Sequence, residues 1–281
     1  MKKPIPATAF FLVCILLSGM ACAGSAEHTW YKLVGENKSK RPEFAFVENN
    51  PNLPNVLIYG DSISIGYTLE VRKRLEGKAN LYRLYCNGGD SASFIHKMTR
   101  MHRLMRDKKN DGYWSFEWDV IHFNFGLHDL KYTTNGRLDK KNGTQVNSTE
   151  QYAKNLTGII SYLKKLVPKA KLIFATTTPV PQGEPGRFAG DAAAYNKTAA
   201  GVMKNYPEII INDLYSFTKP NHSKWWSKPG NVHYGPEGRQ AQGTEVARVI
   251  LNALNPENKE KQNASAEAEH GIVPDKTVKN N

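Results

Sequence analysis

The chain has 281 residues, of which 40% are hydrophobic and 23% are charged. This is the composition of a globular protein, and the length suffices for one large domain or two small ones. The formal net charge is +12, and without Lys2 and Lys3 it would be +10. A basic chain of this kind is attracted to acidic polysaccharide, anionic lipid or cell-wall polymer. Its basic residues are scattered, without recognition-helix or zinc-finger spacing, which argues against nucleic acid as the partner.

The first 26 residues have the pattern of a secretory signal peptide. Two lysines precede the apolar run AFFLVCILLSGMA, and the small residues ACAGSA follow. The apolar run is too short to cross a bilayer as a permanent helix. We therefore expect cleavage near Ala23 or Ala26, a secreted or periplasmic protein, and no membrane span. A lipoprotein anchored through Cys22 is the less favoured alternative, because Gly19 stands where a lipoprotein signal has Leu or a similar residue.

Removal of the leader would leave Cys86 as the single cysteine of the mature chain. A secreted protein with one cysteine has no internal disulfide, so its stability must come from its core. Cys86 ends an apolar run, which indicates a small buried residue and not a nucleophile.

Between residues 27 and 255, short apolar runs alternate with longer helical patterns, and we interpret this region as one domain. The predicted strands are residues 55–60, 80–86, 119–125, 171–178 and 208–214, and the predicted helices are residues 65–76, 92–108, 149–166, 191–205 and 236–254. Ser148 or Thr149 can cap the third of these helices. The alternation predicts βαβ units, and so a mostly parallel sheet covered on both faces. Residues 256–281 are polar and lack aromatic side chains, so we expect a disordered tail.

The residues that follow each strand are the ones to search for function, because the site of such a sheet lies at the carboxyl ends of its strands. Gly60-Asp61-Ser62 follows the first strand. Asp and Ser are favoured helix caps, and this is the simpler interpretation. The functional interpretation makes Ser62 a nucleophile on a tight strand-to-helix turn, where the helix N-terminus favours a developing negative charge. The two interpretations are compatible.

Three further segments fall where functional residues are expected. NGGDSAS follows the second strand, NFGLHDLK follows the third and contains His128 and Asp129, and KPGNVHYGPEG places His233 just before the last helix. The two adjacent glycines allow a turn and the close approach of a ligand. A nucleophilic serine needs a base within hydrogen-bond reach, and histidine is the commonest one, so His233 is the candidate partner of Ser62.

In order and spacing, these four segments resemble the SGNH (GDSL-type) hydrolase family, over residues 54–254. The resemblance implies a three-layer α/β/α sandwich with a mostly parallel, flavodoxin-like five-stranded sheet, and the activity of an acyl esterase or lipase. It also implies that Ser62 is the nucleophile and His233 the base, and that the backbone N–H groups of Ser62 and Gly89 donate to the oxyanion. No cofactor and no metal are expected, and the histidines show no metal-ligand spacing.

The chain departs from the family pattern at two positions. His128 stands where the family has an Asn that donates to the oxyanion; a neutral imidazole N–H can also donate one hydrogen bond, if a neighbour fixes its tautomer. Gly230 stands where the family has the Asp of the triad. The acid is then missing or supplied from elsewhere, and Asn231 or a backbone carbonyl near Gly230 could orient the imidazole of a Ser–His dyad. Asp61, as a helix cap, and Asp129, as a residue that could hold His128, complete the expected site.

The sequence indicates the substrate less directly. Trp225 and Trp226 lie shortly before the base, and they could either stack on sugar rings or fill the core. The basic loop of residues 131–148 could rim the site or be mere surface. Because no long apolar lid for a fatty acyl chain is evident, we expect hydrolysis of short acyl esters, above all acetyl esters, on carbohydrate.

Four alternatives remain open at this point. Two are a lysophospholipase and a thioesterase, and a third is an enzyme that transfers the acyl group to a sugar and not to water. The fourth is a non-catalytic glycan-binding protein on the same scaffold. The oligomeric state is also open.

Overall fold

The computed structural model describes residues 24–255 of the chain. The predicted leader, apart from Gly24, Ser25 and Ala26, and the predicted tail lie outside this range. Those three residues belong to the folded domain, because the Ala26 N–H donates to the carbonyl oxygen of Asp111 at 2.8 Å and the Asp111 N–H donates to that of Gly24 at 2.9 Å. None of the described helices is both long and apolar enough to cross a membrane.

Five parallel strands form the central sheet of the described residues, in the order β2-β1-β3-β7-β8. They are β1 (Asn55–Tyr59), β2 (Asn80–Arg83), β3 (Val120–Asn124), β7 (Lys171–Ala175) and β8 (Ile210–Asn212). In the centre of the sheet, Val56 of β1 pairs with Leu81 of β2 and with Val120 of β3. Every residue of β1 and β3 is buried, as expected of strands covered on both faces. The predicted strands are confirmed, and their order is that of a flavodoxin-like doubly wound sheet.

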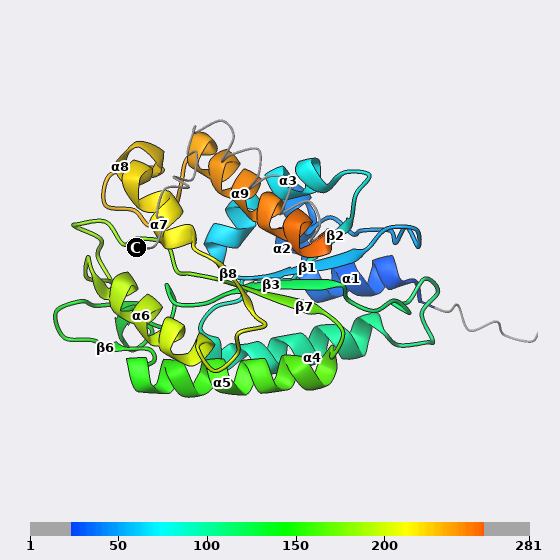
Figure 1. The fold of residues 1–281 in the computed structure, drawn as a ribbon, viewed down its shortest axis with the longest axis horizontal. Helices are drawn as coiled ribbons and strands as arrows, with labels where there is room; N and C mark the ends of the chain where they lie inside the picture. The colour runs from blue at the N-terminus through cyan, green and yellow to red at the C-terminus, as the bar shows by residue number, and fades with distance from the viewer. Residues whose placement is uncertain (1–23, 256–281) are drawn as a thin grey trace, which may run out of the picture.

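Helices cover both faces of this sheet (Figure 1). On one face α3 (Ser62–Leu75) packs against α9 (Pro236–Leu254), and on the other lie α4 (Phe94–Met105), α5 (Thr149–Leu166) and α6 (Asp191–Met203). The three-layer α/β/α sandwich is therefore confirmed. Because the five strands are parallel, their carboxyl ends lie at one edge of the sheet, and the segments with functional signals that follow β1, β2 and β3 meet there.

Capping residues set where the helices begin. Helix α3 begins at Ser62, earlier than predicted, because the Asp61 Oδ1 atom accepts a hydrogen bond from the Ile63 N–H at 2.9 Å. Helix α5 begins at Thr149, as predicted, with Ser148 Oγ accepting from the Gln151 N–H at 3.3 Å. Both caps bind N–H groups that the first helical turn leaves without an intrahelical partner.

The sequence patterns do not predict several short elements. Before β1 lie α1 (Ala26–Val34), α2 (Glu36–Ser39) and the 3-10 turn η1 (Pro42–Phe44); η2 (Ser91–Ser93) precedes α4; and α7 (Leu214–Thr218), η3 (Lys219–Asn221) and α8 (His222–Trp225) lie between β8 and α9. Trp30 attaches α1 to the domain, since its buried indole N–H donates to the Phe44 carbonyl oxygen at 2.8 Å. Such short helices depend on tertiary contacts, which a local pattern does not contain.

The basic loop that follows β3 forms a small antiparallel sheet. Its strands are β4 (Tyr132–Thr134), β5 (Arg137–Leu138) and β6 (Thr144–Gln145), with β4 in the middle. Asn135 and Gly136 connect β4 to β5, with φ angles of 51° and 75°. Asn-Gly is the favoured pair for a two-residue hairpin turn that needs positive φ at both positions. The segment is therefore a structured projection at the carboxyl edge of the central sheet.

Candidate active site

Ser62 lies at the turn between β1 and α3, as its first helical residue. Its side chain is half-buried, and its N–H has no hydrogen-bond partner among residues 24–255. The first N–H groups of a helix point outward along the axis and favour a negative charge. The serine thus combines a hydroxyl at the surface of the cavity with a backbone donor that is free to bind an oxyanion.

His233 reaches Ser62 from a segment 171 positions later in the chain. Its Nε2 atom lies 2.8 Å from Ser62 Oγ. The loop that carries it is held by a bond from the Ser227 N–H to the His233 carbonyl oxygen at 2.7 Å and by one from the Gly235 N–H to the Trp225 carbonyl oxygen at 2.8 Å. The nucleophile and base expected from the sequence therefore lie within hydrogen-bond distance.

Asn231 fixes the orientation and tautomer of the His233 imidazole. Its Oδ1 atom lies 2.8 Å from the His233 backbone nitrogen and 2.7 Å from His233 Nδ1. A backbone N–H can only donate, so the atom that it meets is the amide oxygen of Asn231 and not the amide nitrogen. That oxygen then accepts from Nδ1–H, which leaves Nε2 as the acceptor for the Ser62 hydroxyl. A neutral amide here sets the tautomer that a triad carboxylate sets in serine hydrolases.

The electrostatic surroundings keep His233 neutral. Burial lowers the pKa of its imidazole below the ordinary value, the positive charges of Arg187 and Arg239 lower it further, and the carboxylate of Asp61 opposes them. A neutral imidazole is the form that can remove a proton from Ser62. Asp61 is buried, and its second oxygen, Oδ2, has no hydrogen-bond partner among the described residues.

The Gly89 N–H, which was expected to donate to the oxyanion, has a partner within its own turn. Its N–H donates to Asn87 Oδ1 at 2.9 Å, and the described residues that line the cavity around Ser62 include Asn87 but not Gly89. Gly89 has φ of 71°, so the backbone turns there as its sequence suggested. In this structure the Asn87 side chain occupies the donor that was expected to bind the oxyanion.

His128 lines the same cavity as Ser62 and His233. Gly126, with φ of 140°, makes the turn that brings it there, and a Cβ atom at this position would collide with the Thr177 side chain. The nearest polar partner of the ring is Lys131, whose Nζ lies 3.5 Å from His128 Nδ1. Burial lowers the pKa of the His128 imidazole, which is therefore neutral at neutral pH.

Asp129 has no hydrogen bond to His128 among the described contacts. It is fully buried, and its carboxylate accepts from the Ser91 N–H at 3.0 Å, the Ser91 hydroxyl at 2.5 Å and the Asn147 amide at 2.8 Å. Burial raises the pKa of this carboxyl to about 6. The expected role of holding His128 is thus corrected: Asp129 ties the turn after β3 to the turn after β2.

The cavity around Ser62 has a volume of about 470 Å³ and opens at the carboxyl edge of the sheet. Besides the residues already described, its lining includes Leu127, Leu138, Glu184, Arg187 and Val232. Arg187 is 7% exposed; it pairs with Glu184 at 2.6 Å and donates to the Leu127 carbonyl oxygen at 2.7 Å. Leu138 comes from β5, so the small sheet rims the site. No cluster of His, Cys, Asp and Glu in residues 24–255 could hold a metal ion.

Known structures share this architecture, although no family model and no curated protein sequence matches the chain. A lipase/acylhydrolase from Enterococcus faecalis superposes with a TM-score of 0.52 and 17% identity, over 70% of this chain and 95% of its own. The acetyl xylan esterase AlAXEase superposes with a TM-score of 0.51 and 16% identity, over 70% of this chain and 99% of its own. A GDSL-like lipase from Bacteroides thetaiotaomicron superposes with a TM-score of 0.50 and 14% identity, over 79% of this chain and 99% of its own. The chain has the SGNH-hydrolase fold.

The two tryptophans before the base do not lie at the site of this SGNH fold. The described residues that line the cavity include neither of them. Trp225 is 9% exposed, packs on Phe217 with ring centroids 5.7 Å apart, and donates to Glu237 at 3.3 Å. Trp226 is half-buried and packs edge-on against His222. The expectation that Trp225 stacks on a sugar is corrected, because the core and α9 enclose its indole.

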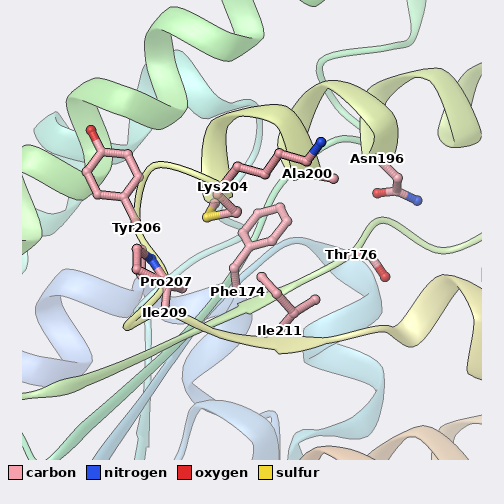
Figure 2. A pocket seen from close by; sticks show the side chains of 10 residues that line it. Phe174, Thr176, Asn196, Ala200, Lys204, Tyr206, Pro207, Ile209 and Ile211 are labelled. Atoms are coloured by element: carbon pink, nitrogen blue, oxygen red, sulfur yellow. The ribbon is translucent and has the colours of Figure 1, made fainter.

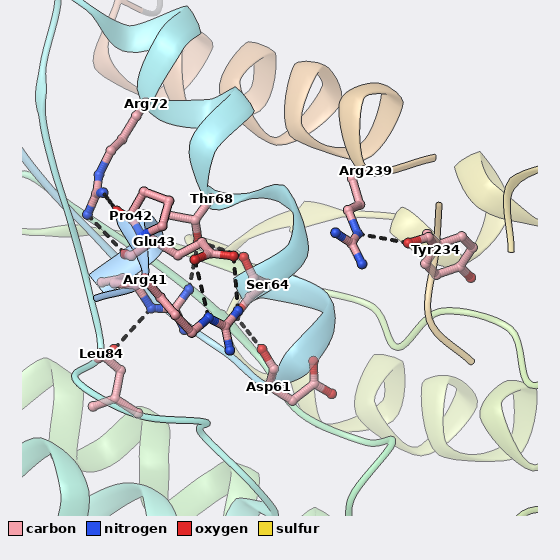
Figure 3. Close-up of polar contacts among 11 residues, drawn as sticks. Arg41, Pro42, Glu43, Asp61, Ser64, Thr68, Arg72, Leu84, Tyr234 and Arg239 are labelled. Carbon is pink, nitrogen blue, oxygen red and sulfur yellow. Dashed lines mark hydrogen bonds and ion pairs between the residues drawn. The ribbon is translucent and has the colours of Figure 1, made fainter. Parts of the chain in front are cut away.

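A buried network that the sequence did not reveal supports the helix that begins at Ser62 (Figure 3). Ser64 Oγ donates to the Asp61 carbonyl oxygen and Thr68 Oγ1 to the Ser64 carbonyl oxygen, both at 2.7 Å. Arg83 of β2, which is fully buried, donates to Thr68 Oγ1 at 2.6 Å. Burial lowers the pKa of Arg83 to about 9. These bonds tie the first turns of α3, and so Ser62, to the sheet. A lone arginine in the apolar run NLYRLYC was the available signal.

The loop that carries His233 has a similar support from the last helix. Arg239, on the first turn of α9, donates through Nε to the Tyr234 carbonyl oxygen at 2.8 Å (Figure 3). The aliphatic part of the same side chain packs over Gly66 of α3. A Cβ atom added at Gly66 would lie 3.4 Å from Arg239 Cγ. Arg239 thus bridges the helix that starts at Ser62 and the loop that carries His233.

A second cavity, of about 350 Å³, lies between α6 and the β7–β8 edge of the sheet (Figure 2). Its lining is mostly apolar and includes Phe174, Ala200, Met203 and Ile211, with Lys204 beside them. None of the expected site residues is among the described residues that line it. It is therefore a feature of the packing of α6 on the sheet and is separate from the cavity around Ser62.

Proposed function

We propose that this protein is a serine esterase that removes short acyl groups, above all acetyl groups, from carbohydrate. The observation that carries the proposal is the contact of 2.8 Å between Ser62 Oγ and His233 Nε2, with Nδ1 of the same ring held by Asn231. A nucleophile, a base and a group that orients the base are the parts that acyl transfer requires. The proposal therefore follows from the site and is consistent with its fold.

In the proposed mechanism each of these residues has a step. His233 accepts the proton of Ser62 as the serine oxygen attacks the ester carbonyl carbon. The carbonyl oxygen becomes an oxyanion, which the Ser62 N–H and the His128 imidazole N–H bind. The C–O bond to the alcohol breaks, and His233 gives the leaving oxygen its proton. Water then attacks the acyl-serine, with His233 again as the base, and the free acid leaves.

The shape and polarity of the cavity favour a small acyl group over a fatty chain. Its lining mixes apolar side chains such as Leu127 and Val232 with the polar or charged side chains of His128, Lys131 and Arg187. The mostly apolar cavity between α6 and the sheet does not have Ser62 among its described lining residues. A fatty acyl chain would need a continuous apolar surface leading from the nucleophile. A lysophospholipase or thioesterase is the weaker alternative for this reason, and the acetyl xylan esterase of the same fold is consistent with the carbohydrate esterase.

Acetyl and propionyl esters should be cleaved at least tenfold faster, as kcat/KM, than octanoyl and longer esters, because each methylene beyond the cavity gains no burial. The measurement is a series of 4-nitrophenyl esters of increasing acyl length, with Ser62→Ala as the blank. Acetic acid release from acetylated xylan and from acetylated acidic glycans then tests the alcohol. A preference for long chains would favour the lipid hydrolase, and no cleavage of any ester would favour a glycan-binding protein.

Asn231→Asp should shift the pH dependence of kcat/KM to higher pH. In the natural protein the pKa of His233 is lowered below its ordinary value of 6.5, so the imidazole stays neutral down to a lower pH. The acid limb of the profile should therefore lie below pH 6.5. A carboxylate beside Nδ1 stabilises the imidazolium and raises the pKa of His233, by about one to three units. Rates from pH 4 to 9 measure both limbs. An unchanged acid limb in the variant would mean that Asn231 does not face the working base.

We propose that the protein acts outside the cytoplasm, after removal of its leader. Cleavage after Ala23 is favoured over cleavage after Ala26, because Gly24 and Ala26 bond to Asp111 in the folded domain. Loss of these residues would remove a contact that anchors α1. Lipidation at Cys22 would leave the same contact in place and stays the less favoured alternative.

A further inference from the structure

Lys131 lies beside His128 in the catalytic cavity and has no assigned role in the steps above. Its Nζ is 3.5 Å from His128 Nδ1, and both side chains line the cavity that holds Ser62. The small sheet holds its backbone, since the Val146 N–H donates to the Lys131 carbonyl oxygen at 3.1 Å. None of the salt bridges among the described residues includes Lys131. Its charge is therefore directed at the imidazole and at the cavity.

The contact decides which nitrogen of His128 carries the proton. An ammonium group has donors and no acceptor, so Nδ1 facing Lys131 must be the unprotonated nitrogen. In a neutral ring the proton then sits on Nε2, and Nε2–H is the donor that remains. An asparagine at this position would need no such neighbour, because its amide always carries donors. The histidine needs one, and Lys131 is in place to supply it.

The charged groups around His128 act in both directions on its protonation. Burial disfavours the imidazolium, and the positive charges of Lys131 and Arg187 disfavour it further, whereas Asp61 and Asp90 favour it. These groups come from four segments: the turn before α3, the turn after β2, the start of the small sheet and the segment before α6. The balance lowers the pKa of His128, so the ring near Ser62 is the neutral donor.

We propose that Lys131 is a positioning residue of this active site, which holds His128 in its neutral, Nε2-protonated form so that the ring donates to the oxyanion. The inference rests on the proposed esterase function and deepens it. His128 and Lys131 then act as one unit, which replaces the single amide donor that the sequence resemblance would place at residue 128. Lys131 works through His128 and does not touch the reacting atoms.

A double-mutant cycle tests this coupling. Lys131→Met, which keeps the length of the side chain, should lower kcat by about ten- to a hundredfold and change KM little, as expected for loss of one charge-assisted hydrogen bond. In the His128→Asn background, where no tautomer has to be set, the same substitution should change kcat by less than about twofold. Lys131→Arg keeps a cationic donor and should recover most of the activity. Equal losses in the two backgrounds, or a loss confined to KM, would overturn the inference in favour of a substrate contact.

A second measurement needs no catalysis. The ¹⁵N resonances of the His128 ring should show protonated Nε2 and unprotonated Nδ1 in the natural protein. Lys131→Met should give mixed tautomers and a higher pKa of His128, since one positive neighbour is gone. Protonated Nδ1 in the natural protein would overturn the inference. If the protein cleaves no ester, the proposed function fails, while the tautomer is still read from these spectra, so the two failures are distinguishable.

Discussion

Ser62→Ala and His233→Ala should each lower kcat for a short-chain ester by about 10⁴- to 10⁶-fold, because the two residues form one catalytic unit. Without the Ser62 hydroxyl there is no oxygen to acylate, and without the imidazole the hydroxyl keeps its proton. For the same reason the two losses should not add, and the double variant should be about as active as the less active single variant. Initial rates with an acetyl ester measure all three losses.

The two substitutions should leave the fold intact, since Ser62 begins a helix that Asp61 caps and His233 is half-buried in a loop. Circular dichroism and the thermal midpoint check this. His222→Ala is a matched control: its ring contacts the Tyr234 hydroxyl at 3.0 Å in the same region and makes no contact with Ser62 among the described hydrogen bonds. It should stay within a few-fold of natural activity. A fluorophosphonate that labels a serine other than Ser62 would contradict the assignment of the nucleophile.

The sequence predicts the parts of the fold and site that depend on local patterns and strand order. The five strands are short apolar runs, and the βαβ alternation places their carboxyl ends together, so Ser62 and His233 could be expected at one edge although 171 positions separate them. Asn231 lies two positions before the base, and an amide so close in sequence can reach Nδ1 of the same turn. In these cases the chain itself brings the groups together.

Other features depend on packing between segments that no local pattern links. Trp225 and Trp226 are adjacent in sequence, and the phase of the short helix α8 decides that Trp225 faces the core. The Gly89 N–H meets the side chain of Asn87, which reads from sequence as an ordinary turn residue. The burial of Arg83 depends on the helix that packs over β2. Such choices of rotamer and partner follow from the assembled domain.

Asn87 also bears on how the oxyanion is bound. Its side chain lines the catalytic cavity while its Oδ1 accepts from the Gly89 N–H. In the described structure, the Ser62 N–H and the His128 ring are therefore the available donors of the expected set. Catalysis relies on donors that are already aimed at the oxyanion, since realigning them costs part of the gain. This makes His128 more important here than one donor among three would be.

His128→Ala should therefore lower kcat and kcat/KM together, by roughly 10²- to 10³-fold, because the lost hydrogen bond is made mainly in the transition state. His128→Asn restores an amide donor at the same position and should recover part of that loss. Steady-state kinetics with an acetyl ester measure both variants. The donor role predicts a fall in kcat, whereas a role in substrate binding would raise KM at unchanged kcat.

The same variants separate catalysis from stability. Asp129 bonds to Ser91 and Asn147 and not to His128, so removing the half-buried ring breaks no described bond of that buried network, and the thermal midpoint should change little. Asp129→Ala is the contrasting variant. It strips the carboxylate from three donors, which should lower the midpoint and reduce the yield of folded protein. Among well-folded proteins, the loss from His233→Ala should exceed the loss from His128→Ala. The reverse order would make His128 the base, with His233 as the auxiliary donor.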